Sequence, residues 1–274
     1  MKRLPLGPDD ALPYEHHEPA RDGAPTFVFV NALTGSTAAW EAAVAPHLRD
    51  GGFGTLSYNF RGQEGAPFAA GTELTPTLIV DDLCALLRHC APSNPVLTGL
   101  SIGGLFAAQA VLRKVFPARG LVLLNTLREI GPRIAWVNDA MEVIVGAGGV
   151  PLFMDALFPL LVNPEFASQS RANFLKGDYA PMDPSHGHMN LMRNARATDW
   201  DITYEDLTLP TLVITGHQDR VFLDTEVVDR LYKRLSDARR EDWPDAGHLL
   251  PLERPDRLAE SLARFGAEIE GAGQ

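Results

Sequence analysis

A serine in a glycine-rich segment is the first candidate for chemistry. Ser101 stands in Gly99-Leu100-Ser101-Ile102-Gly103, between a short apolar run and a segment with helical spacing. Small residues two before and two after such a serine let it sit on a tight turn that exposes its hydroxyl, which is the nucleophile-elbow pattern. The N–H of Ile102, at the predicted helix start, points at the same space and could stabilise an oxyanion. The alternative is a turn with a capping serine, but the strand–turn–helix context favours a nucleophile.

A serine hydroxyl is a weak nucleophile and needs a base. His248 follows Asp245-Ala246-Gly247 in a predicted loop, just before a helix that opens with Arg254-Pro255. A loop after the last predicted strand lies where a base can reach Ser101. We therefore predict that His248 is the base.

The other seven histidines have ordinary explanations. His16, His17, His47 and His89 fall in segments expected to be exposed or helical. His186 and His188 fall in the long insertion described below. The last two lack a convincing third ligand, so we predict no metal site and a place on the surface or lining a pocket. His217 is expected to pack or to hydrogen-bond locally.

A histidine base needs an acceptor that holds its tautomer. Asp219 follows the apolar run 211–215 in Gly216-His217-Gln218-Asp219, and the order Ser, Asp, His is the one this type of elbow uses. Asp245 is too close to His248 in sequence to be the usual partner, and Asp224 is typical of a helix cap. Asp219 is therefore the predicted acid.

A second oxyanion donor is expected in the loop after the first buried strand. That loop contains Leu33, whose backbone N–H is the candidate, with Thr34 or Ser36 able to assist through a hydroxyl. The alternative is an ordinary Asx or Ser turn. Trp40 follows in a predicted helix and is expected to pack rather than to act in catalysis.

The elements that must position these residues alternate between strands and helices. Apolar runs without alternation predict strands buried on both faces, and helices between them predict right-handed parallel units. The predicted fold class is α/β, with a mostly parallel twisted sheet flanked by helices. The predicted strands are 26–32, 55–60, 95–100, 121–125 and 211–215, and the predicted helices are 75–90, 103–116, 225–235 and 255–269.

One stretch breaks this alternation. Residues 128–205 contain no strong strand signal but many apolar residues, and glycines and prolines predict that they form short helices. We predict a helical cap over the strand ends, inserted between core segments 1–127 and 206–274. The alternative is that these helices simply cover a face of the sheet.

Taken together, these motifs resemble those of the α/β-hydrolase superfamily. The resemblance rests on the segments 99–104, 31–40, 59–62, 216–219 and 246–255, which span nearly the whole chain except the predicted cap. It implies the α/β-hydrolase fold, a Ser101–Asp219–His248 triad, and an oxyanion hole formed by Leu33 and Ile102. The motifs are specific for fold and triad and only weakly specific for substrate.

Two departures from the common pattern stand out. Most relatives have His-Gly where this chain has Asn31-Ala32, and Asn at that position is similar to the 3-oxoadipate enol-lactonases. The amide of Asn31 could anchor the loop where others use imidazole. Asn59 and Gln63 replace the Asp and His-Gly that relatives often have, which weakens the enol-lactonase comparison but leaves the triad unchanged.

Composition limits the other classes of protein. The chain has 274 residues and a formal charge of −11, which argues against a nucleic-acid partner and against attraction to anionic membranes. No signal peptide and no uninterrupted apolar run of membrane-spanning length are apparent, and Cys84 and Cys90 are expected to be free thiols, so we expect a cytoplasmic protein. No phosphate loop or dinucleotide fingerprint is present, and we infer no cofactor.

The expected function is hydrolysis of a small carboxylic ester or lactone through an acyl-enzyme on Ser101. Hydrolysis of a carbon–carbon bond in a diketone uses the same triad in relatives and remains open. A cofactor-free perhydrolase or a lyase on this fold also remains open. A non-catalytic small-molecule receptor is the alternative from another class. The oligomeric state and the identity of the substrate are not predicted.

Overall fold

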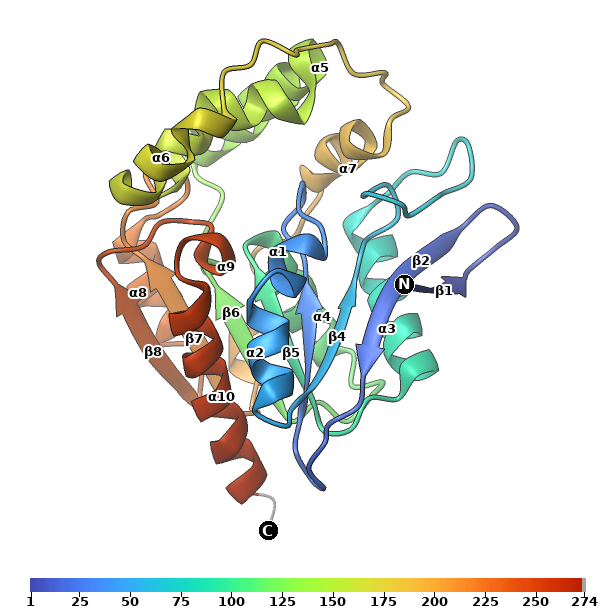
Figure 1. Ribbon diagram of the computed structural model, residues 1–274, viewed down its shortest axis with the longest axis vertical. Helices are drawn as coiled ribbons and strands as arrows, with labels where there is room; N and C mark the ends of the chain where they lie inside the picture. The colour runs from blue at the N-terminus through green and yellow to red at the C-terminus, as the bar shows by residue number, and fades with distance from the viewer. Residues whose placement is uncertain (273–274) are drawn as a thin grey trace.

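The protein is built around one mixed sheet. The computed structural model describes residues 1–272, and within them the sheet has eight strands in the order β1-β2-β4-β3-β5-β6-β7-β8 (Figure 1). The strands from β4 to β8 in this order are parallel, whereas β1 and β2 are antiparallel at one edge. Their bounds are β1 Lys2–Pro5, β2 Ala11–His17, β3 Thr26–Val30, β4 Gly54–Tyr58, β5 Pro95–Leu100, β6 Gly120–Leu124, β7 Thr211–Gly216 and β8 Ala238–Trp243.

The five central strands are buried along their whole length. Side chains of successive residues alternate between two apolar clusters, because a strand points them to opposite faces of the sheet. Val28 and Leu97 pack on one face, and Phe29 and Val96 pack on the other. This confirms the predicted α/β fold class with a mostly parallel sheet.

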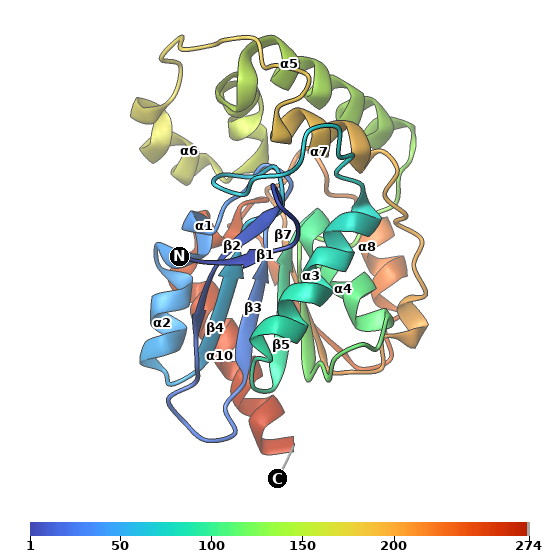
Figure 2. The same ribbon diagram turned by 90° about the vertical axis from the view of Figure 1, so that its right-hand side faces the viewer.

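Helices cover both faces of the sheet (Figure 2). One layer contains α3 and α4, which contact each other, and also α8, whose buried side chains join the same apolar cluster. The other layer contains α2 and α10, which also contact each other, together with α1 and the short α9. Their bounds are α1 Ala38–Glu41, α2 Val44–Asp50, α3 Pro76–Cys90, α4 Ile102–Leu112, α8 Thr225–Tyr232, α9 Leu250–Glu253 and α10 Pro255–Ala272.

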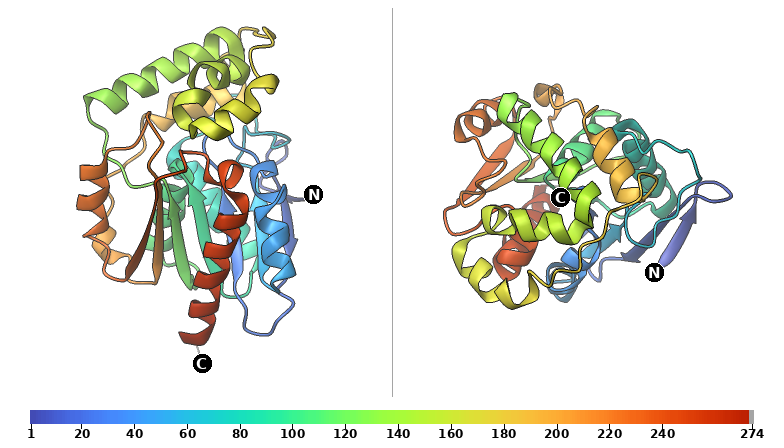
Figure 3. Two further views of the ribbon diagram at one scale, coloured as in Figure 1. Left: turned by 60° about the vertical axis from the view of Figure 1, so that its left-hand side comes forward. Right: turned by 90° about the horizontal axis from the view of Figure 1, so that it is seen from above.

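Three further helices, between β6 and β7, lie above the carboxyl ends of the strands (Figure 3). They are α5 Pro132–Leu161, α6 Pro164–Ser170 and α7 Gly187–Ala195, with short 3₁₀ turns at Arg171–Asn173 and Tyr204–Asp206. We call residues 128–205 the cap segment. Its apolar cluster includes Val145 and Phe153 and extends to Val221 and Phe222 of the core. The division into domains at 127/128 and 205/206 stays a prediction.

The expectation that glycines and prolines break the cap segment into short helices is confirmed within α5, whose 30 residues are two helices joined at a kink. Gly148 and Gly149 kink it, with Gly149 at φ +71°, but the helix resumes directly. Pro151 lies in the first turn after the kink, where a missing N–H removes no helical hydrogen bond. Gly148 and Gly149 therefore divide α5 as expected, whereas Pro159 lies inside the second helix without ending it.

The length and composition of α5 also meet the criteria for a membrane-spanning helix, and it is the one such helix in the described part of the chain. The criteria allow up to two charged residues, and the span includes the kink at Gly148 and Gly149, so the expectation of no uninterrupted apolar run is not contradicted. About a quarter of its most apolar window is buried (28%), and Trp136 and Val143 are exposed. The absence of a membrane partner stays a prediction.

Three strands escaped the sequence analysis. β1 and β2 form an antiparallel edge whose prolines and histidines lack a continuous apolar pattern, which is why they were not predicted as strands. His16 and His17 therefore lie in a strand and not in the exposed or helical segment expected for them. β8 reads Ala-Arg-Arg-Glu-Asp-Trp, and only Trp243 is buried. Edge strands bury few side chains and often carry charges, which removes the signal that identifies central strands.

Candidate active site

Ser101 occupies a sharp turn between β5 and α4. Its backbone has φ 58° and ψ −125°, a conformation that non-glycine residues rarely adopt. A Cβ atom at Gly99 would lie 2.3 Å from Gly104 N, and one at Gly103 would lie 2.3 Å from Asn31 O. The turn therefore requires glycine on both sides of the serine, because backbone passes directly against each of these positions.

His248 and Asp219 are joined by a short hydrogen bond. His248 Nδ1 lies 2.6 Å from Asp219 Oδ2, and both side chains are buried. The other carboxylate oxygen of Asp219 accepts hydrogen bonds from the N–H groups of Val221 and Phe222, both at 2.9 Å. Burial acts to raise the pKa of Asp219, but the charge and hydrogen bond of His248, the Phe222 N–H and Arg128 together lower it. Asp219 is therefore an ionised acceptor that orients the imidazole.

The loop that carries His248 is held from two directions. The backbone N–H of His248 donates to the carbonyl of Leu161, the last residue of α5, at 2.5 Å, and Arg220 N donates to Leu160 O at 2.9 Å. The buried carboxylate of Glu253 accepts from the N–H groups that flank His248, Gly247 N at 2.8 Å and Leu249 N at 2.9 Å. The cap segment and α9 thus fix the backbone at His248.

Leu33 and Ile102 both border the cavity that contains Ser101. Ile102 is the first residue of α4, so its N–H has no acceptor within the helix. Leu33 N makes no hydrogen bond within residues 1–272. Two N–H groups are therefore available beside the serine. Thr34 and Ser36 are partly exposed, and their hydroxyls make no hydrogen bond in this part of the chain.

A buried amide network shapes the loop of Leu33. Gln63 donates from Nε2 to the carbonyls of Ala32 and Leu33 at 2.9 and 3.0 Å. Its Oε1 accepts from Asn31 Nδ2 at 3.0 Å and from Phe60 N at 2.9 Å. Gln63, which the sequence analysis saw only as a departure from the family pattern, thus holds the backbone of this loop.

Asn31 and Asn59 complete this network. Asn31 Nδ2 also donates to Tyr58 O and Asn59 Oδ1, both at 3.0 Å, and Asn59 Oδ1 accepts from Thr37 N at 2.8 Å. Asn31 Oδ1 accepts from Trp40 Nε1 at 2.8 Å. Trp40 packs, as predicted, by stacking on Phe29 with ring centroids 4.7 Å apart, and it also anchors the amide that replaces the usual imidazole.

Arg128 is a site residue that the sequence analysis missed. Its Nη2 donates to Ser101 Oγ at 2.9 Å and to Asn125 O at 2.8 Å. No hydrogen bond joins Ser101 to His248 within residues 1–272. The guanidinium lies over the rings of Trp200 and Phe222, 4.8 and 4.6 Å from their centroids. The one sequence signal was a cation four residues after the end of β6, near the carboxyl ends of the strands.

The cavity at Ser101 is small, about 60 Å³. Its walls are mostly apolar, and its charged members are both arginines. They comprise Leu33, Ser101, Ile102, Arg128, Asn138, Met141, Met192, Ala195, Arg196, Trp200 and Phe222. Arg196 is half exposed and pairs with Asp139 and Glu142. The arrangement can accept a small, partly apolar group against the serine.

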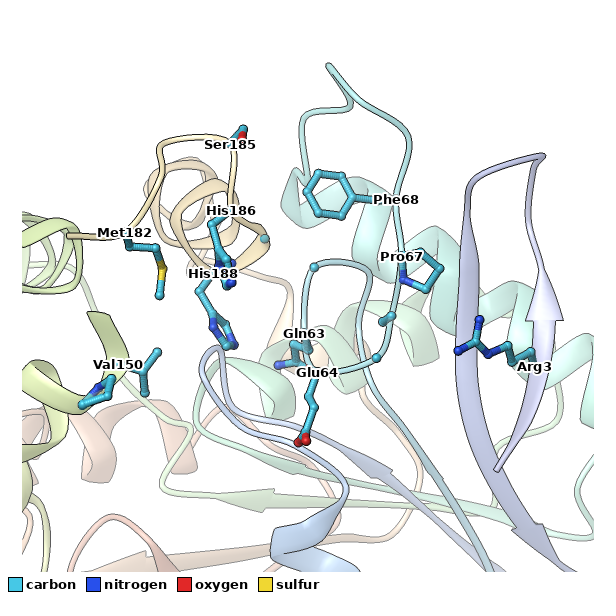
Figure 4. A pocket seen from close by; sticks show the side chains of 15 residues that line it. Arg3, Gln63, Glu64, Pro67, Phe68, Val150, Met182, Ser185, His186 and His188 are labelled. Atoms are coloured by element: carbon cyan, nitrogen blue, oxygen red, sulfur yellow. The ribbon is translucent and has the colours of Figure 1, made fainter. Parts of the chain in front are cut away.

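A larger cleft of about 850 Å³ lies between the cap segment and the loop after β4 (Figure 4). Gln63 and Phe68 line it from the core, and Met182, His186 and His188 line it from the cap segment. The two histidines are thus pocket-lining, one of the two places expected for them. Burial is the main cause that lowers the pKa of His188.

The remaining polar candidates have structural contacts. His217 Nε2 lies 2.9 Å from Asp242 Oδ1, a local hydrogen bond as predicted. Asp224 caps α8 by accepting from Glu226 N and Val227 N. Asp245 pairs with Arg254 and Arg257, away from His248. Only Asp219, of the three aspartates considered, contacts the imidazole.

Comparisons with known proteins agree with this fold. The sequence model described as the alpha/beta hydrolase family matches residues 27–261. The chain is 22% identical over 251 residues to 3-oxoadipate enol-lactonase 1 of Acinetobacter baylyi, covering 91% of each chain. An α/β-hydrolase enzyme from a deep-sea metagenome library superposes with a TM-score of 0.81 at 19% identity, covering 94% of each chain. A thermophilic esterase from Thermogutta terrifontis superposes with a TM-score of 0.78 at 22% identity, covering 98% of this chain and all (100%) of that one.

Proposed function

This chain belongs to the α/β-hydrolase family, and we propose that it is a serine hydrolase that cleaves a small carboxylic ester or lactone. The observation that carries the proposal is the buried hydrogen bond between His248 and Asp219, together with a serine on a strained elbow at the carboxyl end of β5. The enol-lactonase and esterase among its relatives support ester chemistry. The tight cavity at Ser101 supports a small acyl group.

The first step is attack of Ser101 Oγ on the carbonyl carbon. Because Nδ1 of His248 donates its hydrogen to Asp219, the other ring nitrogen is free to accept the serine proton. The new Oγ–carbon bond forms as that proton moves to His248, and the ionised Asp219 stabilises the resulting imidazolium. The ring of Phe222, with its centroid 4.8 Å from that of His248, restricts the imidazole plane.

The carbonyl oxygen becomes an oxyanion during this attack. The N–H groups of Leu33 and Ile102 are the donors for it, and loss of one such donor typically costs about 3 kcal/mol of transition-state stabilisation. The Gln63–Asn31 network keeps the Leu33 loop in place before substrate binds. Preorganised donors need no rearrangement at the moment of reaction.

The intermediate then collapses and is hydrolysed. The carbon–oxygen bond to the leaving group breaks, and His248 gives its proton to the leaving oxygen. Water, deprotonated by the same histidine, attacks the acyl carbon and releases Ser101 with its hydroxyl restored. In a lactone the leaving oxygen stays attached to the acyl chain, so one product forms.

The test compares wild type, Ser101→Ala and Asp219→Asn on short phenyl esters and small lactones. Ser101→Ala should lower kcat by at least about 10³-fold, because the nucleophile is lost. Turnover within a few fold of wild type in Ser101→Ala would rule the proposal out. Mass spectrometry of the products separates ester cleavage from carbon–carbon cleavage, and a ligand that binds and is released unchanged would favour a receptor.

A further inference from the structure

Arg128 is a buried cation with no direct ion pair, although the charge of Asp219 acts on it at longer range. Its side chain is 6% exposed, and it forms no ion pair with a carboxylate in the part of the chain that the structure describes. Burial is the largest influence on its pKa and lowers it to about 10, so the guanidinium stays charged near neutral pH. Removing an ion from water without pairing it is unfavourable for folding. A buried cation of this kind is therefore a candidate for binding a ligand.

The hydrogen-bonding capacity of Arg128 is only partly used. Nη2 carries both of its hydrogen bonds within residues 1–272. Nε is fully buried without an acceptor, and Nη1 makes no hydrogen bond in this part of the chain. A guanidinium has five N–H donors in a fork that matches the two oxygens of a carboxylate. The guanidinium therefore has N–H donors that no protein acceptor uses and that an anion could accept from.

The surroundings of the cavity favour the same ligand chemistry. The chain as a whole has a charge of −11, yet the cavity at Ser101 is lined by two arginines and no acidic residue. The rings of Trp200 and Phe222 both contact the guanidinium, so its position is restricted before a ligand arrives. A preorganised cation in an apolar cavity binds a carboxylate more strongly than an exposed one does.

We propose that the substrate carries a free carboxylate a few bonds from the scissile carbonyl, and that Arg128 binds it. This inference rests on the proposed function, since it names the substrate class of the same serine. Nη2 lies 2.9 Å from Ser101 Oγ, so an anion on the guanidinium must be close to the acyl carbon. The bound carboxylate takes over donors of Arg128, which releases the serine hydroxyl to donate to His248.

The test uses two matched pairs of phenyl esters. One ester of each pair is the monoester of succinic or glutaric acid with its free carboxylate, and the other has a neutral amide in place of that carboxylate. The wild type should prefer the carboxylate ester. Arg128→Met should lower kcat/KM for the carboxylate ester by about 10- to 100-fold more than for the amide, because a charge-assisted contact is lost only in the first.

Two further variants sharpen this comparison. Arg128→Lys keeps the charge without the planar fork and should retain part of the preference. Arg119→Met removes an exposed arginine at the opposite end of the sheet, in the turn before β6, and should leave the preference unchanged. Equal loss on both esters in Arg128→Met would overturn the proposal, because Arg128 would then act on Ser101 rather than on the substrate.

Binding without turnover separates this proposal from the hydrolase proposal. Calorimetry with glutarate should show binding to Ser101→Ala, and weakening of at least about tenfold in the Ser101→Ala, Arg128→Met double variant. If glutarate binds in this way but wild type hydrolyses no ester, the carboxylate site is supported and the proposal of a serine hydrolase is rejected. Ester turnover with no preference for the carboxylate ester, and no glutarate binding, would reject the carboxylate site alone.

Discussion

Glu253 accepts two hydrogen bonds from Asn163, one from the backbone N–H and one from Nδ2, both at 2.8 Å. Asn163 lies between α5 and α6 of the cap segment, and the same carboxylate holds the N–H groups on each side of His248. A single buried side chain thus joins the cap segment, α9 and the base. Glu253 touches no reacting atom, so it is a positioning residue.

Glu253→Gln should lower both stability and kcat. The amide retains one acceptor oxygen but places an NH₂ group against backbone donors, so we expect a loss of about 3 kcal/mol in the free energy of unfolding. KM should change less than kcat, because the His248 backbone moves while the cavity stays. Urea unfolding and steady-state kinetics measure the two effects.

The matched control is Glu165→Gln. Glu165 is exposed and pairs with Arg254 at the surface, so we expect a change of less than about 1 kcal/mol. If Glu253→Gln behaved like this control in both measurements, the hydrogen bonds from Glu253 to the backbone beside His248 would not affect stability or turnover.

Gly103→Ala should disrupt the elbow. The new Cβ would lie 2.3 and 2.4 Å from the carbonyl oxygens of Asn31 and Val30, which are backbone atoms that cannot rotate away. We expect destabilisation of at least about 2 kcal/mol and loss of most ester turnover. Gly131→Ala is the control, since nothing lies within 4 Å of its Cβ position. Similar Tm values for the two variants would contradict the steric argument.

Gln63→Leu should impair the oxyanion donor of the Leu33 loop. The carbonyls of Ala32 and Leu33, the Phe60 N–H and the Asn31 amide would all lose a partner, at a cost of about 3 kcal/mol in stability. We expect kcat to fall by about 10- to 100-fold with a smaller change in KM. Gln109→Leu removes one hydrogen bond, to Asp199 O, and serves as the control. Unchanged kcat in Gln63→Leu would separate this network from catalysis.

The stability that Asp219 contributes should depend on pH in a defined direction. Its folded pKa lies below the usual 3.8, so as the pH falls the unfolded chain takes up this proton first and stability decreases. The difference in unfolding free energy between wild type and Asp219→Asn should be constant above about pH 5 and shrink below pH 4. Urea unfolding from pH 3 to 7 measures it. A difference that grows on acidification would show that the folded pKa is raised.

The parts of the fold that local pattern and position determine could be predicted from the sequence. The central strands are buried on both faces, so their apolar runs identified β3 to β7, and the glycines around Ser101 identified the elbow. Prediction failed at β8, where charges hide an edge strand. Within α5, the predicted break lies at Gly148 and Gly149, where two helices meet at a kink. The position of Arg128 after β6 did not single it out, because its surroundings depend on Trp200 and Phe222, which come from distant parts of the chain.

The hydrogen bonds from Arg220 and His248 to the end of α5 use the carbonyl groups of Leu160 and Leu161. Every amino acid has a carbonyl, so substitutions along α5 can change what a substrate meets while leaving these two acceptors in place. Inserting or deleting one residue would instead turn every later carbonyl by about 100° around the helix axis. Laboratory evolution of new specificity should therefore vary the side chains of this helix and keep its length constant.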